Sequence, residues 1–241
     1  MTQPHAAAED PALARLVDAA LPHVAFDGWS EVTLRAAARD AGLSPDEARR
    51  LLPRGAVDLA AAFHRRGDRE MIARLAAADL SSLRFRDRVA SAVRYRLEAA
   101  GDREAVRRAA ALFALPHNAP LGAQLIWGTA DAIWTALGDT SQDINWYSKR
   151  ATLSAVYSAT VLYWLGDESP DHAATWDFLD RRIEDVMRIE KLKAQISESP
   201  ALKGLAALPA RLFARVRAPA APRDDLPGRW PSPPREGKES P

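Results

Sequence analysis

The chain has 241 residues, and with 47% of them apolar it can bury one large hydrophobic core or two small ones. A count of 33 Lys and Arg against 32 Asp and Glu gives a formal net charge of +1, which excludes a global positive field for holding a polyanion such as DNA. The chain has no cysteine, which excludes disulfides, thiolate nucleophiles and cysteine-based zinc sites and is compatible with a cytoplasmic location.

Abundant alanine and arginine, few β-branched residues, and Gly and Pro placed between periodic stretches predict an all-α fold of about nine to ten helices. A first helix is expected over residues 11–21, before an interruption at Pro22. Ser30 is a candidate N-cap for a helix over residues 31–41, and Ser44-Pro45-Asp46-Glu47 begins a short third helix. Two short helices separated by a Gly-containing turn form a helix-turn-helix pattern.

Six further helices are predicted from apolar residues at helical spacing, with short connections that favour antiparallel packing of neighbours. They are expected over residues 57–78, 83–99, 102–115, 119–137, 145–165 and 170–196. The sequence therefore predicts a flexible N-terminus over residues 1–10, a helix-turn-helix head with its linking helix over residues 11–78, and a helical body over residues 79–196.

The stretch over residues 200–217 places apolar and cationic residues on opposite sides of a helical wheel. This pattern is typical of a helix that lies in the plane of a membrane surface, where each cation contributes about 1 kcal/mol near anionic lipids. The alternative is a last helix packed on the domain with a basic outer face. The predicted membrane-binding residues are Leu202, Lys203, Leu205, Leu208, Arg211, Leu212, Phe213, Arg215 and Val216.

The remaining residues, 218–241, are Pro-rich and are predicted to be disordered. No uninterrupted apolar run reaches the roughly 18 residues of a membrane-spanning helix, and the first residues lack the pattern of a signal or transit peptide. We therefore expect a cytoplasmic protein that meets the inner (cytoplasmic) membrane only at its surface.

Motifs of catalysis are absent from the sequence. The five histidines are far apart, and no H-E-x-x-H, phosphate-binding glycine loop, dinucleotide fingerprint or G-x-S-x-G elbow occurs. His172, beside Asp171 at an expected helix start, suits a capping or solvated role better than a metal site. The sequence therefore predicts no catalytic residue, no metal and no cofactor.

Aromatic residues concentrate on the two helices expected over residues 119–137 and 145–165. Trp127 and Trp134 are two helical turns apart, and the following helix interleaves bulky residues with small Ala, Ser and Thr. One interpretation is an ordinary core, and the other is a tunnel for a long apolar ligand. The candidate lining residues are Trp127, Ile133, Trp134, Tyr157 and Leu162.

The segment Asp143-Ile144-Asn145-Trp146-Tyr147 combines two aromatic residues with a polar cap at a helix start. Trp and Tyr are favoured anchors of protein interfaces because they contribute a large rigid area and a polar tip. The alternative is that Trp146 only fixes the beginning of the helix.

Two segments resemble known families. Residues 28–55, GWSEVTLRAAARDAGLSPDEARRLLPRG, resemble the DNA-binding head of TetR-type repressors. Residues 143–160, DINWYSKRATLSAVYSAT, and 169–183, SPDHAATWDFLDRRI, resemble the ubiquinone biosynthesis accessory family called coenzyme Q protein nine, which shares the repressor fold. The resemblance covers roughly residues 10–215 and rests mainly on the N-W-Y-x-[KR]-R and S-P-D-x-x-x-T-W-x-F-L patterns.

The resemblance implies a non-catalytic protein that binds an isoprenoid quinone intermediate in an apolar cavity. It also implies that an amphipathic C-terminal helix, here residues 200–217, meets the membrane, and that the intermediate is presented to a demethoxyubiquinone hydroxylase. Asp143, Trp146 and Tyr147 match the surface that docks this hydroxylase. Repressor-fold proteins pair through their last two long helices, so a homodimer through residues 145–196 is expected.

The alternative function is a ligand-responsive transcriptional regulator of the TetR type. A recognition helix must approach DNA phosphates, whereas here the second helix of the pair begins with Asp46 and Glu47, which would repel them. Arg49, Arg50 and Arg54 compensate for part of this negative charge. The sequence therefore makes DNA an unlikely partner.

Overall fold

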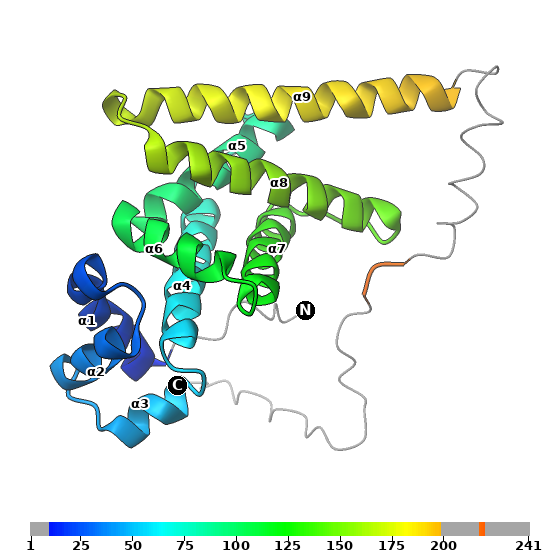
Figure 1. Ribbon diagram of the computed structural model, residues 1–241. Coiled ribbons are helices and arrows are strands. Elements are labelled where there is room, and N and C mark those ends of the chain that lie inside the picture. Colours follow the sequence, from blue (N-terminus) through cyan, green and yellow to red (C-terminus); the bar gives the residue numbers. More distant parts are fainter. Residues whose placement is uncertain (1–9, 199–216, 220–241) are drawn as a thin grey trace, which may run out of the picture.

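The computed structural model describes residues 10–198 and 217–219, and within these ranges the regular structure is entirely helical (Figure 1). The all-α fold predicted from the sequence is confirmed, and most helices begin and end within two residues of their expected bounds. In chain order the elements are α1 (Pro11–Asp27), α2 (Glu31–Asp40), α3 (Pro45–Leu51), α4 (Ala56–Ala77), α5 (Phe85–Ala100), α6 (Arg103–Ala114), α7 (Ala119–Ala136), α8 (Ile144–Gly166), the short 3-10 helix η1 (Pro170–His172) and α9 (Ala173–Glu198).

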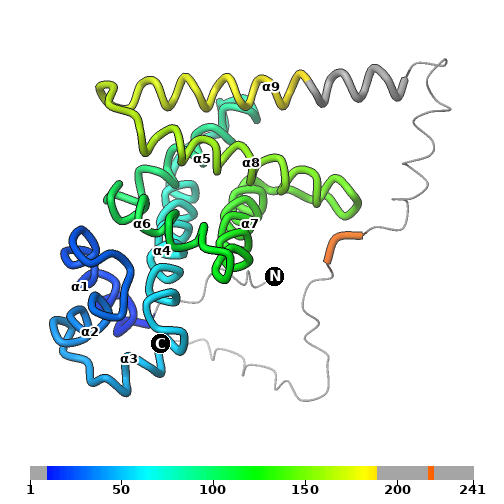
Figure 2. The backbone as a smooth tube through the Cα atoms, viewed as in Figure 1, coloured from blue at the N-terminus to red at the C-terminus, as the bar shows by residue number. Residues whose placement is uncertain are grey.

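The helices form a small head and a larger body. Helices α1, α2 and α3 cluster at one end of the molecule, and α4 leads from this head into the body (Figures 1 and 2). Helices α8 and α9 pack against each other at the opposite end. Among the described residues no helix combines the length and the apolarity needed to cross a bilayer.

The head has its own apolar core, formed mainly by one face of α1 with α2 and the start of α4. Helix α1 does not end before Pro22, as the sequence predicted, but continues to Asp27. A proline inside a helix removes one backbone hydrogen bond. Here Leu16, Ala20 and Val24 are fully buried on both sides of that position, so burial of the continued apolar face compensates for the lost bond.

Local caps begin the next three helices. Thr33 donates its backbone N–H to Ser30 Oγ (3.2 Å) at the start of α2. Ser44 and Glu47 form a reciprocal capping box at the start of α3. Helix α4 lacks a side-chain cap from its own N-cap residue, Gly55, and Ala56 instead donates its N–H to Glu31 Oε1 of α2 (3.0 Å).

The body buries a second apolar core between α4, α5, α7, α8 and α9. Met71, Leu97, Ile133 and Leu179 are its most deeply buried large side chains. At the start of α9, Asp167 accepts hydrogen bonds from the N–H (2.9 Å) and the hydroxyl (2.5 Å) of Thr175. This helix start is therefore fixed by a carboxylate upstream of the Asp171-His172 pair.

Candidate functional site

Two cavities lie in the body, on different sides of α8. The first, called the α6 cavity here, has a volume of about 370 Å³ and is surrounded by α4, α5, α6, α7 and α8. Most of its lining is apolar. The lining residues are Phe63, His64, Arg96, Leu97, Ala100, Val106, Ala109, Ala110, Phe113, Ala114, Ala119, Gly122, Ala123, Leu125, Ile126, Tyr157, Ser158, Val161 and Leu162.

One wall of the α6 cavity is polar, because a buried ion pair stands behind it. Arg96 donates from Nε to Asp68 Oδ1 (2.6 Å) and from Nη2 to the carbonyl oxygen of His64 (2.8 Å). Thr129 Oγ1 lies 2.8 Å from Asp68 Oδ1 and 2.9 Å from His64 Nε2. The network joins α4, α5 and α7, and Tyr157 of α8 lies beside it, with its ring centroid 5.9 Å from the Arg96 guanidinium carbon.

The electrostatics of this wall follow from its burial. Burial, helped by the positive charge of Arg96, lowers the pKa of His64 from 6.5 to about 4, so its imidazole is neutral at neutral pH. Burial also raises the pKa of the Tyr157 phenol, which stays protonated. The charges of Arg96 and Asp68 cancel, and the wall as a whole is neutral.

The second cavity, called the α9 cavity here, has a volume of about 480 Å³ and lies between α5, the α7–α8 connection, α8 and α9. Phe85 and Met187 line it and are partly exposed, and the Phe85 ring stacks on Trp134. Lys149 lies in its polar part. The lining residues are Phe85, Arg86, Val89, Trp134, Leu137, Gly138, Asp139, Thr140, Ser141, Asn145, Ser148, Lys149, Thr152, Leu153, Val156, Ile183, Val186 and Met187.

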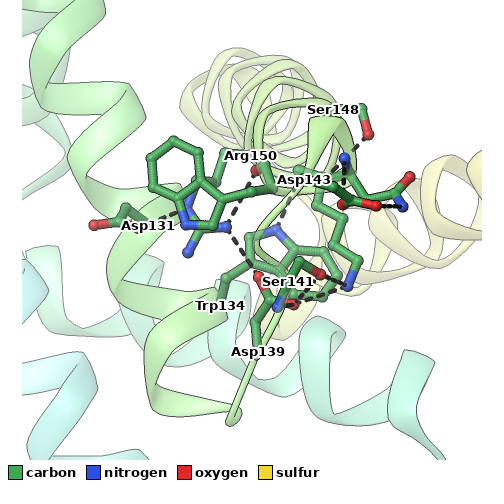
Figure 3. Close-up of polar contacts among 10 residues, drawn as sticks. Asp131, Trp134, Asp139, Ser141, Asp143, Ser148 and Arg150 are labelled. Carbon is green, nitrogen blue, oxygen red and sulfur yellow. Dashed lines mark hydrogen bonds and ion pairs between the residues drawn. The ribbon is translucent and has the colours of Figure 1, made fainter. Parts of the chain in front are cut away.

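Beside the α9 cavity, a cluster of charged residues holds the start of α8 (Figure 3). Arg150 is 2% exposed and donates to Asp131 Oδ1 (2.6 Å) from Nε and to Asp139 Oδ2 (2.9 Å) from Nη1. Lys149 donates to Asp139 Oδ1 (2.8 Å). Burial raises the pKa of Asp139, but hydrogen bonds from Lys149, Ser141 and Arg150 outweigh it and bring this pKa down to about 2.

Above this cluster lies an aromatic surface formed by Trp127, Trp146 and Tyr147. The Trp146 ring centroid is 5.9 Å from that of Trp127 and 4.8 Å from that of Tyr147. The Arg150 guanidinium carbon lies 3.9 Å from the Trp146 ring centroid, and Arg150 also donates to the Trp146 carbonyl oxygen (3.1 Å). A buried, doubly paired arginine therefore supports Trp146 from below.

Asp143 and the described C-terminal residues lie at the edge of this surface. Asp143 is exposed and caps α8 by accepting the backbone N–H of Asn145 (3.0 Å). The hydroxyl of Tyr147 donates to the carbonyl oxygen of Arg217 (3.2 Å), and the N–H of Ala218 donates to the carbonyl oxygen of Gln142 (3.0 Å). Residues 217–219 thus contact the start of α8 (Figure 2).

The residues that the sequence proposed for a lipid tunnel lie in different places. Tyr157 and Leu162 line the α6 cavity, and Trp134 lines the α9 cavity. Ile133 is fully buried in the body core, and Trp127 belongs to the aromatic surface. The proposed membrane-binding residues, 202–216, lie outside the described residues.

Sequence reasoning missed the polar wall of the α6 cavity. Arg96 lies in a largely apolar part of α5, Asp68 of α4 lies between Gly67 and Arg69, and the two charged residues are each less than a tenth exposed. Two opposite charges on buried helix faces are a signal for a buried pair, but 28 residues separate them and periodicity does not show which helices meet. No group of three or more His, Asp or Glu residues with metal-site geometry occurs in the described ranges.

The fold is that of TetR-type regulators. A crystal structure of a TetR transcriptional regulator from Nitrosomonas europaea matches with a TM-score of 0.60 and 24% sequence identity, covering 73% of this chain and 97% of that one. This likeness establishes the fold class of the molecule and says nothing about its function.

Sequence comparison is more specific. The COQ9 family model matches residues 119–190, which include α7, α8 and the start of α9. The Drosophila melanogaster protein named "Ubiquinone biosynthesis protein COQ9, mitochondrial" is 30% identical over 187 residues, which are 76% of this chain and 57% of that protein. The human protein of the same name is 39% identical over 92 residues, 38% of this chain and 29% of that protein.

The chain belongs to the COQ9 family. A relative from Dictyostelium discoideum, named "Probable ubiquinone biosynthesis protein coq9, mitochondrial", is 29% identical over 194 residues, 77% of this chain and 62% of that protein. The chain thus spans less than two thirds of the length of these curated relatives.

Proposed function

We propose that this chain is a non-catalytic accessory protein of ubiquinone biosynthesis that binds an isoprenoid quinone intermediate and presents it to a demethoxyubiquinone hydroxylase. The observation that carries this proposal is the α6 cavity, which is mainly apolar and about 370 Å³ in volume. This size lies in the usual range for small-molecule sites. A core that served only for packing would be filled to a density that leaves few voids larger than a water molecule.

The aromatic surface supports the docking part of the proposal. Trp146 and Tyr147 are partly buried against Trp127 and against each other, so they present rigid aromatic area that loses little entropy on binding. Asp143 adds an exposed negative charge at its edge. A protein partner with an apolar patch beside a cation fits this surface.

Membrane association is proposed from the sequence of residues 200–217. Cations at positions such as Lys203 and Arg211 oppose an apolar stripe, which suits the surface of a membrane with anionic lipids, including the inner (cytoplasmic) membrane. The described end of this stretch, Arg217, accepts a hydrogen bond from Tyr147 of the aromatic surface.

A homodimer through α8 and α9 is also proposed. Leu162 and Tyr163 of α8 are 68% and 39% exposed, and Tyr163 stacks on Phe178 of α9. Exposed apolar side chains on two packed helices suit burial against a second copy. Light scattering on Leu162→Glu tests this proposal, and an unchanged dimer mass, or a monomeric parent protein, would contradict it.

The head does not favour DNA binding. Glu47 is held in the capping box, Asp46 pairs with Arg49, and Arg54 pairs with Asp58. Two of the three arginines that could grip phosphates are therefore already partnered by carboxylates. Sequence-specific nanomolar binding in gel-shift assays on genomic fragments at low salt would reverse this conclusion.

The ligand part is tested by native mass spectrometry of the full chain purified from its own host. Ala110→Phe fills the α6 cavity, and Thr152→Phe makes a matched change in the α9 cavity. We expect a quinone-like or other isoprenoid lipid in the parent protein and in Thr152→Phe, and its loss from Ala110→Phe. A parent protein that is always empty, or loss only from Thr152→Phe, would contradict the proposal.

The docking part is tested by co-purification with the hydroxylase. Trp146→Ala should abolish binding, because it removes the side chain on which Trp127, Tyr147 and Arg150 converge. Phe26→Ala, which removes an aromatic side chain that is 84% exposed on α1, is the control and should bind as the parent does. Equal binding by both variants would reject the aromatic surface as the docking site.

The membrane part is tested by co-sedimentation with vesicles that contain anionic lipids. Arg211→Gln combined with Arg215→Gln should weaken binding while leaving residues 217–219 in place. Equal sedimentation of this variant and the parent protein would reject the role given to residues 200–217.

A further inference from the structure

The wall of the α6 cavity contains a tyrosine hydroxyl group for which the described part of the chain offers no hydrogen-bond partner. Tyr157 is 4% exposed and lines the cavity, yet its hydroxyl makes no hydrogen bond within the described part of the chain. The neighbouring polar groups differ in this respect, since the Thr129 hydroxyl is hydrogen-bonded to both Asp68 and His64. An apolar ligand that fills the cavity would take this hydroxyl out of contact with water. Because burial of an unpaired hydroxyl is unfavourable, a ligand that carries a hydrogen-bond acceptor would be favoured.

The charges of the wall limit what that acceptor can be. Arg96 is matched by Asp68 at 2.6 Å, and His64 is neutral because burial and Arg96 lower its pKa to about 4. A ligand carboxylate would add a buried negative charge with no free cation to compensate it. A pure hydrocarbon would leave the phenol unpaired. A neutral carbonyl oxygen satisfies both conditions, because it accepts a hydrogen bond and carries no net charge.

We propose that Tyr157 is the residue of the α6 cavity that selects its ligand, by donating a hydrogen bond to a neutral carbonyl oxygen. Apolar molecules that carry a ketone or quinone carbonyl are therefore preferred over fatty-acid anions and over plain hydrocarbons. This inference rests on the proposed function, since it assumes that the α6 cavity binds an apolar ligand, and it adds the residue that recognises the carbonyl oxygen of that ligand.

Three probes that each carry one six-membered carbon ring and the same ten-carbon tail separate these classes. They are decyl-1,4-benzoquinone, decylbenzene and 4-decylbenzoate, titrated at pH 7.5 into the delipidated full chain and followed by isothermal calorimetry. We expect the quinone to bind about three- to tenfold more tightly than decylbenzene, the effect of one buried hydrogen bond, and the benzoate to bind most weakly.

Tyr157→Phe should remove the preference for the quinone over decylbenzene while leaving the affinity for decylbenzene unchanged. Tyr163→Phe is the matched control, because it makes the same change six residues further along α8 at a side chain that does not line the cavity. It should keep the full preference.

An infrared measurement on the parent protein covers the case in which Tyr157→Phe folds poorly. The carbonyl stretch of ¹³C-labelled decyl-1,4-benzoquinone should move to lower wavenumber on binding, because a donated hydrogen bond weakens the C=O bond. An unshifted band, or equal affinity for the quinone and decylbenzene, would overturn the assignment of Tyr157 while the proposed lipid-binding function stands. Tightest binding of the benzoate would overturn it in favour of an anion site, and failure of all three probes to bind would overturn both proposals.

Discussion

Arg96 and Arg150 are both almost fully buried, at 3% and 2% exposed, and both pair with aspartates, but they support different features. Arg150 is held by two carboxylates close to it in the sequence, Asp131 and Asp139, and its guanidinium lies against Trp146 of the aromatic surface. Arg96 lines the α6 cavity and, among the described residues, pairs with one carboxylate, that of Asp68 on α4.

The comparison shows that the residues around a buried arginine decide which feature of the molecule it supports. Arg150 has several neighbouring acceptors, so its cluster fixes the start of α8 and supports the aromatic surface. In the Arg96 cluster the charges of Arg96 and Asp68 cancel, so the cavity wall is neutral. The Tyr157 phenol beside this pair remains available to a ligand.

The largest expected effect comes from removing each arginine in turn. Arg96→Met leaves Asp68 buried with only Thr129 and His64 beside it, and should lower the free energy of unfolding by about 3–5 kcal/mol. Arg150→Met should cost less, about 1.5–3 kcal/mol, because Asp139 keeps Lys149 and Ser141 as partners. Urea unfolding at pH 7.5 measures both.

The same two variants also separate the functions. Arg150→Met should weaken binding of the hydroxylase, because Trp146 loses the guanidinium beneath it, and should leave binding of the quinone probe unchanged. A larger stability loss in Arg150→Met than in Arg96→Met would show that the two clusters do not differ as described.

A smaller effect is expected from mild acid, which acts on the Arg96 cluster alone. Unfolded histidine takes up its proton near pH 6.5, whereas folded His64 does so only near pH 4, because burial, Arg96 and Arg65 disfavour its charged form and Asp68 only partly offsets them. The unfolded state therefore binds more protons between these values. This site should lose on the order of 3 kcal/mol of stability as the pH falls from 6.5 to 4.

Urea unfolding across this pH range should give a steeper loss for the parent protein than for His64→Gln, and the two curves should run parallel above pH 7. The pKa of Asp139 is lowered from 3.8 to about 2, so its contribution to stability is present above pH 3.8 and is lost only as the pH falls toward 2. Parallel curves from pH 7 down to pH 4 would show that His64 is not held neutral by the fold.

The smallest effect is expected from Ser44→Ala, which lies in the head and touches neither cluster. It removes the acceptor for the N–H of Glu47 and half of the capping box, so it should cost about 1 kcal/mol. Binding of the quinone probe and of the hydroxylase should not change. Weaker binding by this variant would mean that the head and the two clusters are coupled.

Much of the fold could be predicted because its signals are local. Ser30 and Ser44 cap the helices that they were expected to cap, and Gly101 and Gly138 lie where α5 and α7 end. Pro22 was misjudged because a proline costs one hydrogen bond locally, while the burial that offsets this cost comes from residues of the surrounding head.

The candidate site was predicted only in part. Asp143, Trp146 and Tyr147 lie together at the start of α8, as their nearly consecutive positions predict, and their docking role stays a prediction. The residues proposed for a single tunnel instead divide between two cavities, the body core and the aromatic surface, because periodicity gives the face of a helix but not the helix that it meets.

The sequence by itself determined the all-helical class, the order and limits of most helices, and the aromatic segment at the start of α8, because hydrophobic period, caps and glycine stops act within a few residues. Only the tertiary structure decided that Asp68 meets Arg96, that Arg150 lies beneath Trp146, and that the Tyr157 hydroxyl is left without a partner in a cavity wall. Such pairings depend on how side chains of distant helices pack together, and the helix preferences of neighbouring residues do not determine that packing.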